Sequence, residues 1–140
     1  MLKKILVATD ASEYSKRALK TALELARKFN SEVELLFVMH MPVMYDFSAY
    51  NYIVSPEQIE EEGELALGAT LEGIDISNVI LSKKKIQGDP AKVILQELED
   101  QDFDLIVMGS HGYGAIAGSI LGSVSQKVLH GAKRSILIVK

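Results

Sequence analysis

Short runs of apolar residues constrain the fold of this chain more than any other feature of its sequence. Four such runs lie within residues 3–9, 32–39, 105–108 and 135–139. A short apolar run without polar alternation is typical of a strand that is buried on both faces. A fifth strand is expected within residues 76–87, where three consecutive lysines suit the edge of a sheet.

Segments with helical features separate these runs. Residues 12–29 carry one apolar stripe, with Ser12 as the expected N-cap and Asn30 as a left-handed residue at the C-terminus. A second helix is expected from Ser55, as N-cap, to about Gly73, and glycines at 63 and 68 are expected to weaken it. Further helices are predicted over residues 91–100, after a Gly-Asp-Pro turn, and over residues 123–129. Residues 41–54 contain four aromatic residues at irregular spacing and are expected to form a loop. This loop either packs its aromatic rings on the body or serves as a flap or partner surface.

This alternation of strands and helices predicts a single α/β domain over residues 1–140, with an open parallel sheet and helices on both faces. In such Rossmann-like sheets, ligands bind beyond the carboxyl ends of the strands, where the winding direction reverses. Asp10, Val38 and Gly109 each follow or end a predicted strand. We therefore expect these three residues to meet in one crevice.

The composition excludes several classes of function. The net charge of −4 disfavours nucleic acid as the main partner, and the absence of cysteine excludes disulfides, thiol catalysis and cysteine-based zinc sites. No stretch has the length of a membrane span, and the N-terminus lacks the pattern of a signal peptide. We expect a soluble, cytoplasmic protein.

A glycine-rich segment follows the strand at residues 105–108 and precedes the last helix. Glycines let the backbone approach an anion, and the free N–H groups at a helix N-terminus attract it. Ser123 and Ser125 stand where a hydroxyl can cap the helix or contact a phosphate oxygen. No lysine or arginine occurs between Asp104 and Gln126, so this is not a Walker A loop. Main-chain N–H groups, hydroxyls and a metal ion would have to hold a phosphate, unless the loop binds nothing.

The spacing Gly109-x2-Gly112-x9-Gly122-Ser123 resembles the ATP-binding motif of the universal stress protein family. The opening ILVATDASEYSKRALKTALELA, the Gly-Asp-Pro turn, the MGSHG segment and the final SILIV extend this resemblance over the whole chain. The resemblance implies a five-stranded sheet of order 3-2-1-4-5, similar to that of the adenine nucleotide alpha hydrolases. It also implies the ATP-binding branch of the family and a homodimer formed through the last strand, residues Ile136, Leu137, Ile138 and Val139.

The same resemblance assigns the residues of a nucleotide site. It places adenine and ribose against Ala8, Asp10, Val38 and Met108, and the phosphates against Gly109, Gly112, Gly122, Ser123, Val124 and Ser125. The implied cofactor is ATP, with Mg²⁺ or Mn²⁺ on its phosphates. Ala8 departs from the proline that many members carry, which loosens that wall of the site. Asp10 has a second interpretation, as a residue that caps the first helix.

Catalytic residues are not evident. The histidines at 40, 111 and 130 are far apart and have no acidic partner at metal-ligand spacing. His111 either contacts a phosphate or bonds locally, and the acids within residues 100–104 are expected at the end of the sheet opposite the crevice. The sequence therefore predicts an ATP-binding regulatory switch with slow or no hydrolysis and with an unidentified protein partner. The alternatives are an enzyme that hydrolyses or transfers a phosphoryl or nucleotidyl group, and an interaction module without nucleotide.

Overall fold

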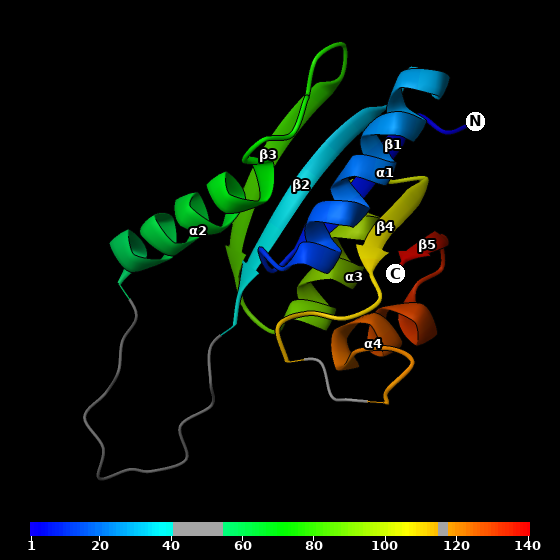
Figure 1. Ribbon diagram of the computed structural model, residues 1–140. Helices are drawn as coiled ribbons and strands as arrows, with labels where there is room; N and C mark the ends of the chain where they lie inside the picture. The colour runs from blue at the N-terminus through cyan, green and yellow to red at the C-terminus, as the bar shows by residue number, and fades with distance from the viewer. Residues whose placement is uncertain (41–54, 115–117) are drawn as a thin grey trace, which may run out of the picture.

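A five-stranded parallel sheet forms the centre of the computed structural model, which describes residues 1–40, 55–114 and 118–140 (Figure 1). The predicted aromatic loop at 41–54 lies outside the described residues. The strand order is β3-β2-β1-β4-β5, and every pairing is parallel. The strands are β1 (Lys4–Thr9), β2 (Glu32–Met39), β3 (Ile80–Gln87), β4 (Leu105–Gly109) and β5 (Ser135–Val139). The predicted class and strand order are confirmed.

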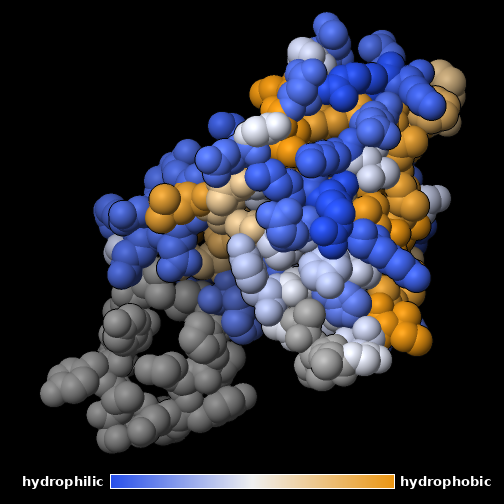
Figure 2. All heavy atoms as spheres, viewed as in Figure 1, coloured by the Kyte–Doolittle hydropathy of each residue, from blue (hydrophilic) through white to orange (hydrophobic). Residues whose placement is uncertain are grey.

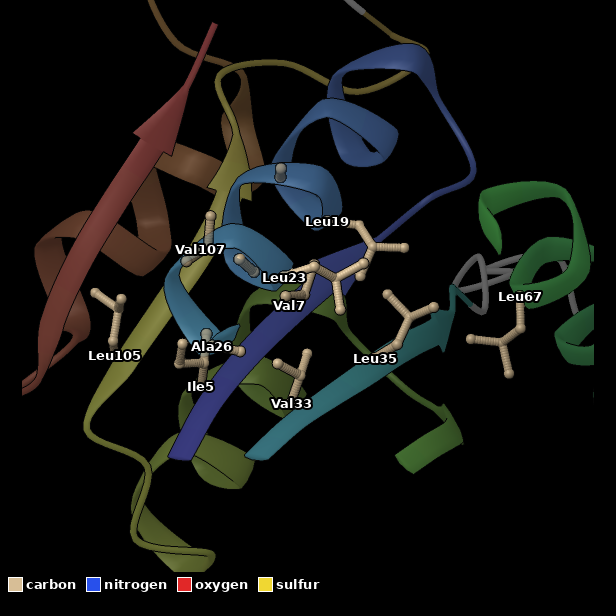
Figure 3. Packing of buried hydrophobic residues seen from close by; sticks show 12 residues of the cluster. Ile5, Val7, Leu19, Leu23, Ala26, Val33, Leu35, Leu67, Leu105 and Val107 are labelled. Atoms are coloured by element: carbon tan, nitrogen blue, oxygen red, sulfur yellow. The ribbon is translucent and has the colours of Figure 1, made fainter. Parts of the chain in front are cut away.

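Helices cover both faces of the sheet. They are α1 (Glu13–Phe29), α2 (Pro56–Leu71), α3 (Pro90–Asp100) and α4 (Ser123–Gly131). Helices α1 and α2 bury apolar side chains against one face, and Figure 3 shows Leu19, Leu23 and Ala26 of α1 directed at the strands. Helices α3 and α4 pack on the other face, where Ile94, Leu98 and Val128 join a second apolar cluster. Within the described parts of the chain, no helix is long and apolar enough to cross a membrane.

Helices α1, α2 and α4 begin at the residues that the sequence predicts, and α3 begins at Pro90, one residue before its predicted start. The Ser12 side chain accepts a hydrogen bond from the Ser15 N–H at 3.3 Å, and Asn30 ends α1 with a left-handed φ of 55°. Ser55 and Gln58 form a reciprocal capping box at the start of α2. Strand β3 begins at Ile80, within the expected range of residues 76–87 but four residues after the start of that range.

Two lysines of β3 form ion pairs with helices, in addition to placing positive charge on the edge of the sheet. Strand β3 is at the edge, as predicted, but successive residues of a strand point to opposite faces. Lys84 binds Glu97 of α3 at 2.8 Å, and Lys85 binds Glu60 and Glu64 of α2. These ion pairs fasten both layers of helices to the edge strand.

The winding direction reverses between β1 and β4. From β1 the chain proceeds outward through β2 to β3, and it then returns to form β4 and β5 on the other side. The loops that follow β1 and β4 therefore lie side by side at the carboxyl ends of these strands (Figure 1).

Candidate functional site

A cavity of about 360 Å³ lies beyond the carboxyl ends of β1, β2 and β4. This volume is within the range of small-molecule sites. All ten residues assigned to a nucleotide site from the sequence line it: Ala8, Asp10, Val38, Met108, Gly109, Gly112, Gly122, Ser123, Val124 and Ser125. The expected convergence of Asp10, Val38 and Gly109 on one crevice is confirmed.

One half of the cavity is apolar. Ala8 and Val38 line it from the strands, with Leu36 paired directly to Ala8 in the register of β1 and β2. Pro90 and Ile94 contribute from the first turns of α3. Several other residues line the cavity without having been predicted from the sequence: Thr9, Ser15, Leu36, His40, Pro90, Ile94 and Tyr113. The alternation of side chains along a strand would have found Leu36 from Val38, but the packing of α3 gives no local signal.

Asp10 ties the two loops of the cavity together. Its Oδ1 accepts hydrogen bonds from the Ser12 N–H at 3.0 Å and the Ser15 hydroxyl at 2.8 Å. Its Oδ2 accepts from the Tyr113 N–H at 3.0 Å. Three of the roughly four acceptor positions of the carboxylate are therefore used, and about one is left for a ligand donor. Asp10 does support the start of α1, although the N-cap itself is Ser12.

The motif glycines allow close contacts within the protein. A Cβ at Gly109 would lie 2.6 Å from the Cβ of Tyr14 and 2.9 Å from its carbonyl carbon, so this glycine lets α1 pack on the end of β4. A Cβ at Gly112 would collide with Oδ2 of Asp10. At Gly122 a Cβ would lie 3.3 Å from the Cα of His111, and the Gly122 N–H donates to the Ser110 carbonyl at 2.7 Å. This last hydrogen bond closes the base of the glycine loop.

The N-terminus of α4 opens onto the cavity without a side-chain cap. The N–H groups of Ser123, Val124 and Ser125 belong to the first turn and have no acceptor within the helix. With the helix dipole they form an arrangement that suits an anion. The Ser125 hydroxyl is buried and donates to the Gly109 carbonyl at 2.8 Å. Capping of α4 by Ser123 or Ser125, one of the two expected roles, is therefore wrong, because Gly122 is the N-cap.

His111 bonds locally. Its Nε2 lies 2.9 Å from the Ser119 carbonyl, which can only accept, so Nε2 carries the proton and donates. Nδ1 of the neutral ring then accepts from the Ser110 hydroxyl at 2.9 Å. Both ring nitrogens of His111 are thus engaged by neighbouring groups of the same loop.

The cavity has little charge of its own. No lysine or arginine is found among its described lining residues, and Asp10 is the one carboxylate there. In the described ranges, no group of three or more His, Asp or Glu side chains could hold a metal ion. A divalent ion would fit this donor set only if phosphate oxygens supplied most of its ligands.

The acidic residues before β4 lie at the opposite end of the sheet, as expected. The Asp104 carboxylate accepts from the Lys3 N–H at 2.8 Å and the Lys4 N–H at 3.0 Å, at the start of β1. These two hydrogen bonds lower the pKa of Asp104 from its ordinary value. Asp104 thus connects neighbouring strands and has no part in the cavity.

Comparison with known proteins gives one consistent family. Residues 1–140 match the model of the universal stress protein family. The universal stress protein MJ0531 of Methanocaldococcus jannaschii is 31% identical over 141 residues, which cover all of this chain and 83% of that protein. The solved structure of the hypothetical protein MJ0577 is 28% identical with a TM-score of 0.73, over 100% of this chain and 96% of that one. A universal stress protein crystallised in complex with cAMP has the same fold, with 23% identity, a TM-score of 0.68 and coverage of 99% and 96%.

Proposed function

The chain belongs to the universal stress protein family, and we propose that it binds ATP in the cavity beyond β1 and β4 as a nucleotide-dependent regulatory switch. The observation that carries this proposal is the convergence of Asp10, the glycine loop and the uncapped N-terminus of α4 on one cavity. The cAMP complex of a protein with the same fold is in keeping with an adenine nucleotide. At 23% identity that likeness concerns the fold, so the proposal depends on the cavity itself.

The apolar half of the cavity suits the base and the polar half suits the phosphates. Ala8, Val38 and Met108 offer apolar surface to a flat adenine ring. The remaining acceptor position of Asp10 can take a hydrogen bond from a ribose hydroxyl or from the adenine amino group. The main-chain N–H groups of residues 123–125 then lie at the phosphate end.

Slow or absent hydrolysis is part of the proposal, and it is supported by the hydrogen bonding of Asp10 and His111 and by the lack of a cationic side chain among the described lining residues. Rapid phosphoryl transfer uses a residue that positions water and a cation that stabilises the transferred group. Asp10 and His111 are engaged in hydrogen bonds, and no arginine is present among the described residues of the cavity. The bound nucleotide would then persist and act as a signal.

The proposal is tested by calorimetry with ATP and Mg²⁺ on two matched glycine variants. In Gly122→Val the added side chain meets His111 and the Ser110 carbonyl at the base of the loop, so we expect ATP binding to be lost. In Gly68→Val the same side chain enters open space on α2, so we expect ATP affinity to be retained. If the unaltered protein gives neither heat nor a thermal shift with millimolar ATP, the proposal fails.

The same protein and its Gly122→Val variant distinguish the proposed switch from two alternative functions. An enzyme that hydrolyses ATP or transfers its phosphoryl or nucleotidyl group would turn over many ATP molecules, and the switch would not. An interaction module without nucleotide would bind no ATP, and Gly122→Val would leave its partner binding unchanged.

We also propose that the protein forms a homodimer through β5. This strand pairs with β4 on one side only within the described residues, and its residues 136–139 are half-buried. Figure 2 shows hydrophobic residues gathered on the side of the molecule where β5 lies in Figure 1. A partly exposed apolar edge strand is a surface that proteins usually cover.

A further inference from the structure

A series of hydrogen bonds leads from the cavity to the interior of α2. It begins at Tyr113, which lines the cavity. The Tyr113 hydroxyl donates to the Ala11 carbonyl at 2.7 Å, and the Tyr113 N–H donates to Asp10 at 3.0 Å. Both bonds cross from the loop after β4 to the loop after β1.

Ala11 is held in a strained conformation by the next bonds of the series. Its φ of 68° is in the left-handed region, which a residue with a Cβ rarely adopts. The Ala11 N–H donates to the Thr9 hydroxyl oxygen at 2.9 Å, and its carbonyl accepts from Tyr113. Such strain persists where surrounding contacts fix it. Here the side chains of Thr9 and Tyr113 hold both main-chain polar groups of the strained residue.

The series continues through two buried threonines. The hydroxyl oxygens of Thr9 and Thr70 are 2.7 Å apart, and these residues are 7% and 1% exposed. The Thr70 hydroxyl donates its one proton to the Ala66 carbonyl of α2 at 2.7 Å. Thr9 must therefore donate to Thr70, and the bonds run in one direction from Thr9 to Thr70 to Ala66.

The threonine pair is a buried polar contact beside apolar side chains. Leu67 and Leu71 of α2 pack beside it against the sheet. A buried hydroxyl that loses its partner costs free energy, so each threonine depends on the other.

We infer that this relay, defined as Tyr113, Ala11, Thr9, Thr70 and Ala66, couples the cavity to α2. This coupling goes beyond the proposed function. The part of it that concerns a bound nucleotide rests on the proposed function. A nucleotide that lies against the glycine loop holds Tyr113 on Ala11, which keeps Ala11 left-handed and Thr9 on Thr70. Occupation of the cavity thereby slows the local opening of α2 at residues 66–72, which gives a partner a surface that differs between the two states.

The relay is tested first without nucleotide, by amide hydrogen exchange. Tyr113→Phe removes the bond to Ala11, and we expect exchange at residues 66–72 to accelerate about threefold, while exchange in α3 stays unchanged. The matched control Tyr14→Phe removes a hydroxyl from a tyrosine outside the relay and should leave hydrogen exchange in α2 unchanged.

Variants at Thr70 test whether the effect passes through the threonine pair. In a Thr70→Val background, Tyr113→Phe should have no further effect on exchange at residues 66–72, and in a Thr70→Ser background it should accelerate exchange again. The double variant Thr9→Val with Thr70→Val removes both hydroxyls at nearly constant shape and should also be insensitive to Tyr113→Phe. Equal effects of Tyr113→Phe in every background would overturn the inference.

The second test adds ATP and Mg²⁺ after calorimetry has measured their binding. Exchange at residues 66–72 should slow about threefold on binding in the unaltered protein and in Thr70→Ser, but not in Thr70→Val. If ATP binds and slows α2 equally in all three proteins, the inference fails and the proposed function stands. If ATP does not bind, the proposed function fails, and so does the proposed effect of ATP on α2. The exchange data on Tyr113→Phe still decide whether the relay exists.

Discussion

Glu34 is a carboxyl group of β2 that the fold keeps largely away from water. Its neighbour Glu97 is 5% exposed, and both oxygens of Glu97 accept from Nζ of Lys84, at 2.8 and 3.0 Å. Oε1 of Glu34 is buried and has no hydrogen-bond partner among the described residues. Burial, and then the adjacent Glu97, raise the pKa of Glu34 to about 7, against a smaller opposing effect of Lys84 and Lys4.

This pKa predicts that stability falls with rising pH. The carboxyl group loses its proton near its ordinary value of 4.5 in the unfolded chain and near 7 in the folded protein. Between these values the folded state binds more protons, so the free energy of unfolding decreases as pH rises from about 4.5 to 7 and then levels off. We expect Glu34→Gln to remove about 1–2 kcal/mol of this loss, less than the full shift would give because the side chain is partly accessible. Urea unfolding at pH 5, 6, 7 and 8 measures it.

The control for this prediction is Glu32→Gln, two residues away on the same strand and exposed. It should leave the pH dependence as it is in the unaltered protein. Parallel stability curves for Glu34→Gln and the unaltered protein would contradict the assignment.

At the residue scale, the sequence predicted which residues line the cavity better than what their side chains do. The family resemblance, which the glycine spacing carries, assigned Gly112, Gly122 and Val124 to the site, and all three line the cavity. The bonding of Ser125 to Gly109 and of His111 to Ser119 depends on how the glycine loop folds back on itself. No periodicity or motif in the sequence encodes that path.

At the scale of elements, α2 shows why two glycines in one helix are not equivalent. A Cβ at Gly63 would lie 2.9 Å from the Cβ of Lys85, whereas a Cβ at Gly68 would meet nothing within 4 Å. The Lys85 side chain lies across Gly63 and reaches Glu60 and Glu64 on either side of it. The expectation that both glycines weaken the helix rests on helix propensity alone and stays a prediction; it did not foresee that Gly63 admits the edge strand.

The two glycines therefore predict substitutions of opposite sign. Gly68→Ala should raise the free energy of unfolding by about 0.5–1 kcal/mol, because alanine has the higher helix propensity. Gly63→Ala should lower it by about 1–2 kcal/mol, because the methyl group meets the base of the Lys85 side chain, which cannot swing away as its tip can. Urea unfolding of the two variants compares them directly. A stabilised Gly63→Ala would show that β3 and α2 pack less tightly than described.

Helix starts were more predictable than strand limits. A helix N-terminus has a local chemical signal, and Ser12 and Ser55 supply it as side-chain acceptors. The start of β3 at Ile80 has no such signal, because it depends on the pairing of Ile80 with Glu32 of β2. The strand order also has no local signal. The alternation of strands and helices predicts a parallel sheet but not the order of its strands, and the order was implied by the family resemblance.

At the scale of the whole molecule, the exposed edge of β5 predicts association. Light scattering at tens of micromolar should give twice the chain mass of 15.4 kDa. Ile138→Lys adds a charge to this edge and should shift the mass toward the monomer. Ile80→Lys adds the same charge to the other edge strand, at a residue that is 69% exposed, and should leave the mass unchanged. A monomer at this concentration, or equal effects of the two lysines, would contradict pairing through β5.

The charge of the molecule predicts that ATP binds together with a divalent cation. The formal net charge is −4, and the described lining of the cavity contains no lysine or arginine. The N-terminus of α4 contributes roughly half a positive charge, which is too little for a triphosphate. A cation on the phosphates would supply the remainder without protein ligands.

We therefore expect EDTA to weaken ATP binding by about tenfold or more, with Mg²⁺ or Mn²⁺ restoring it, and to affect adenosine binding little. Calorimetry with each ligand, in EDTA and in either metal, measures the two ratios. Asp10→Asn tests whether the Asp10 carboxylate or the phosphate oxygens bind the metal ion. It removes the one carboxylate of the described lining while keeping a side-chain acceptor for the Tyr113 N–H. If phosphate oxygens hold the ion, this variant retains the tenfold dependence on metal even where its overall affinity falls. ATP binding of equal strength in EDTA would show that the main-chain N–H groups of the glycine loop and α4 neutralise the triphosphate unaided.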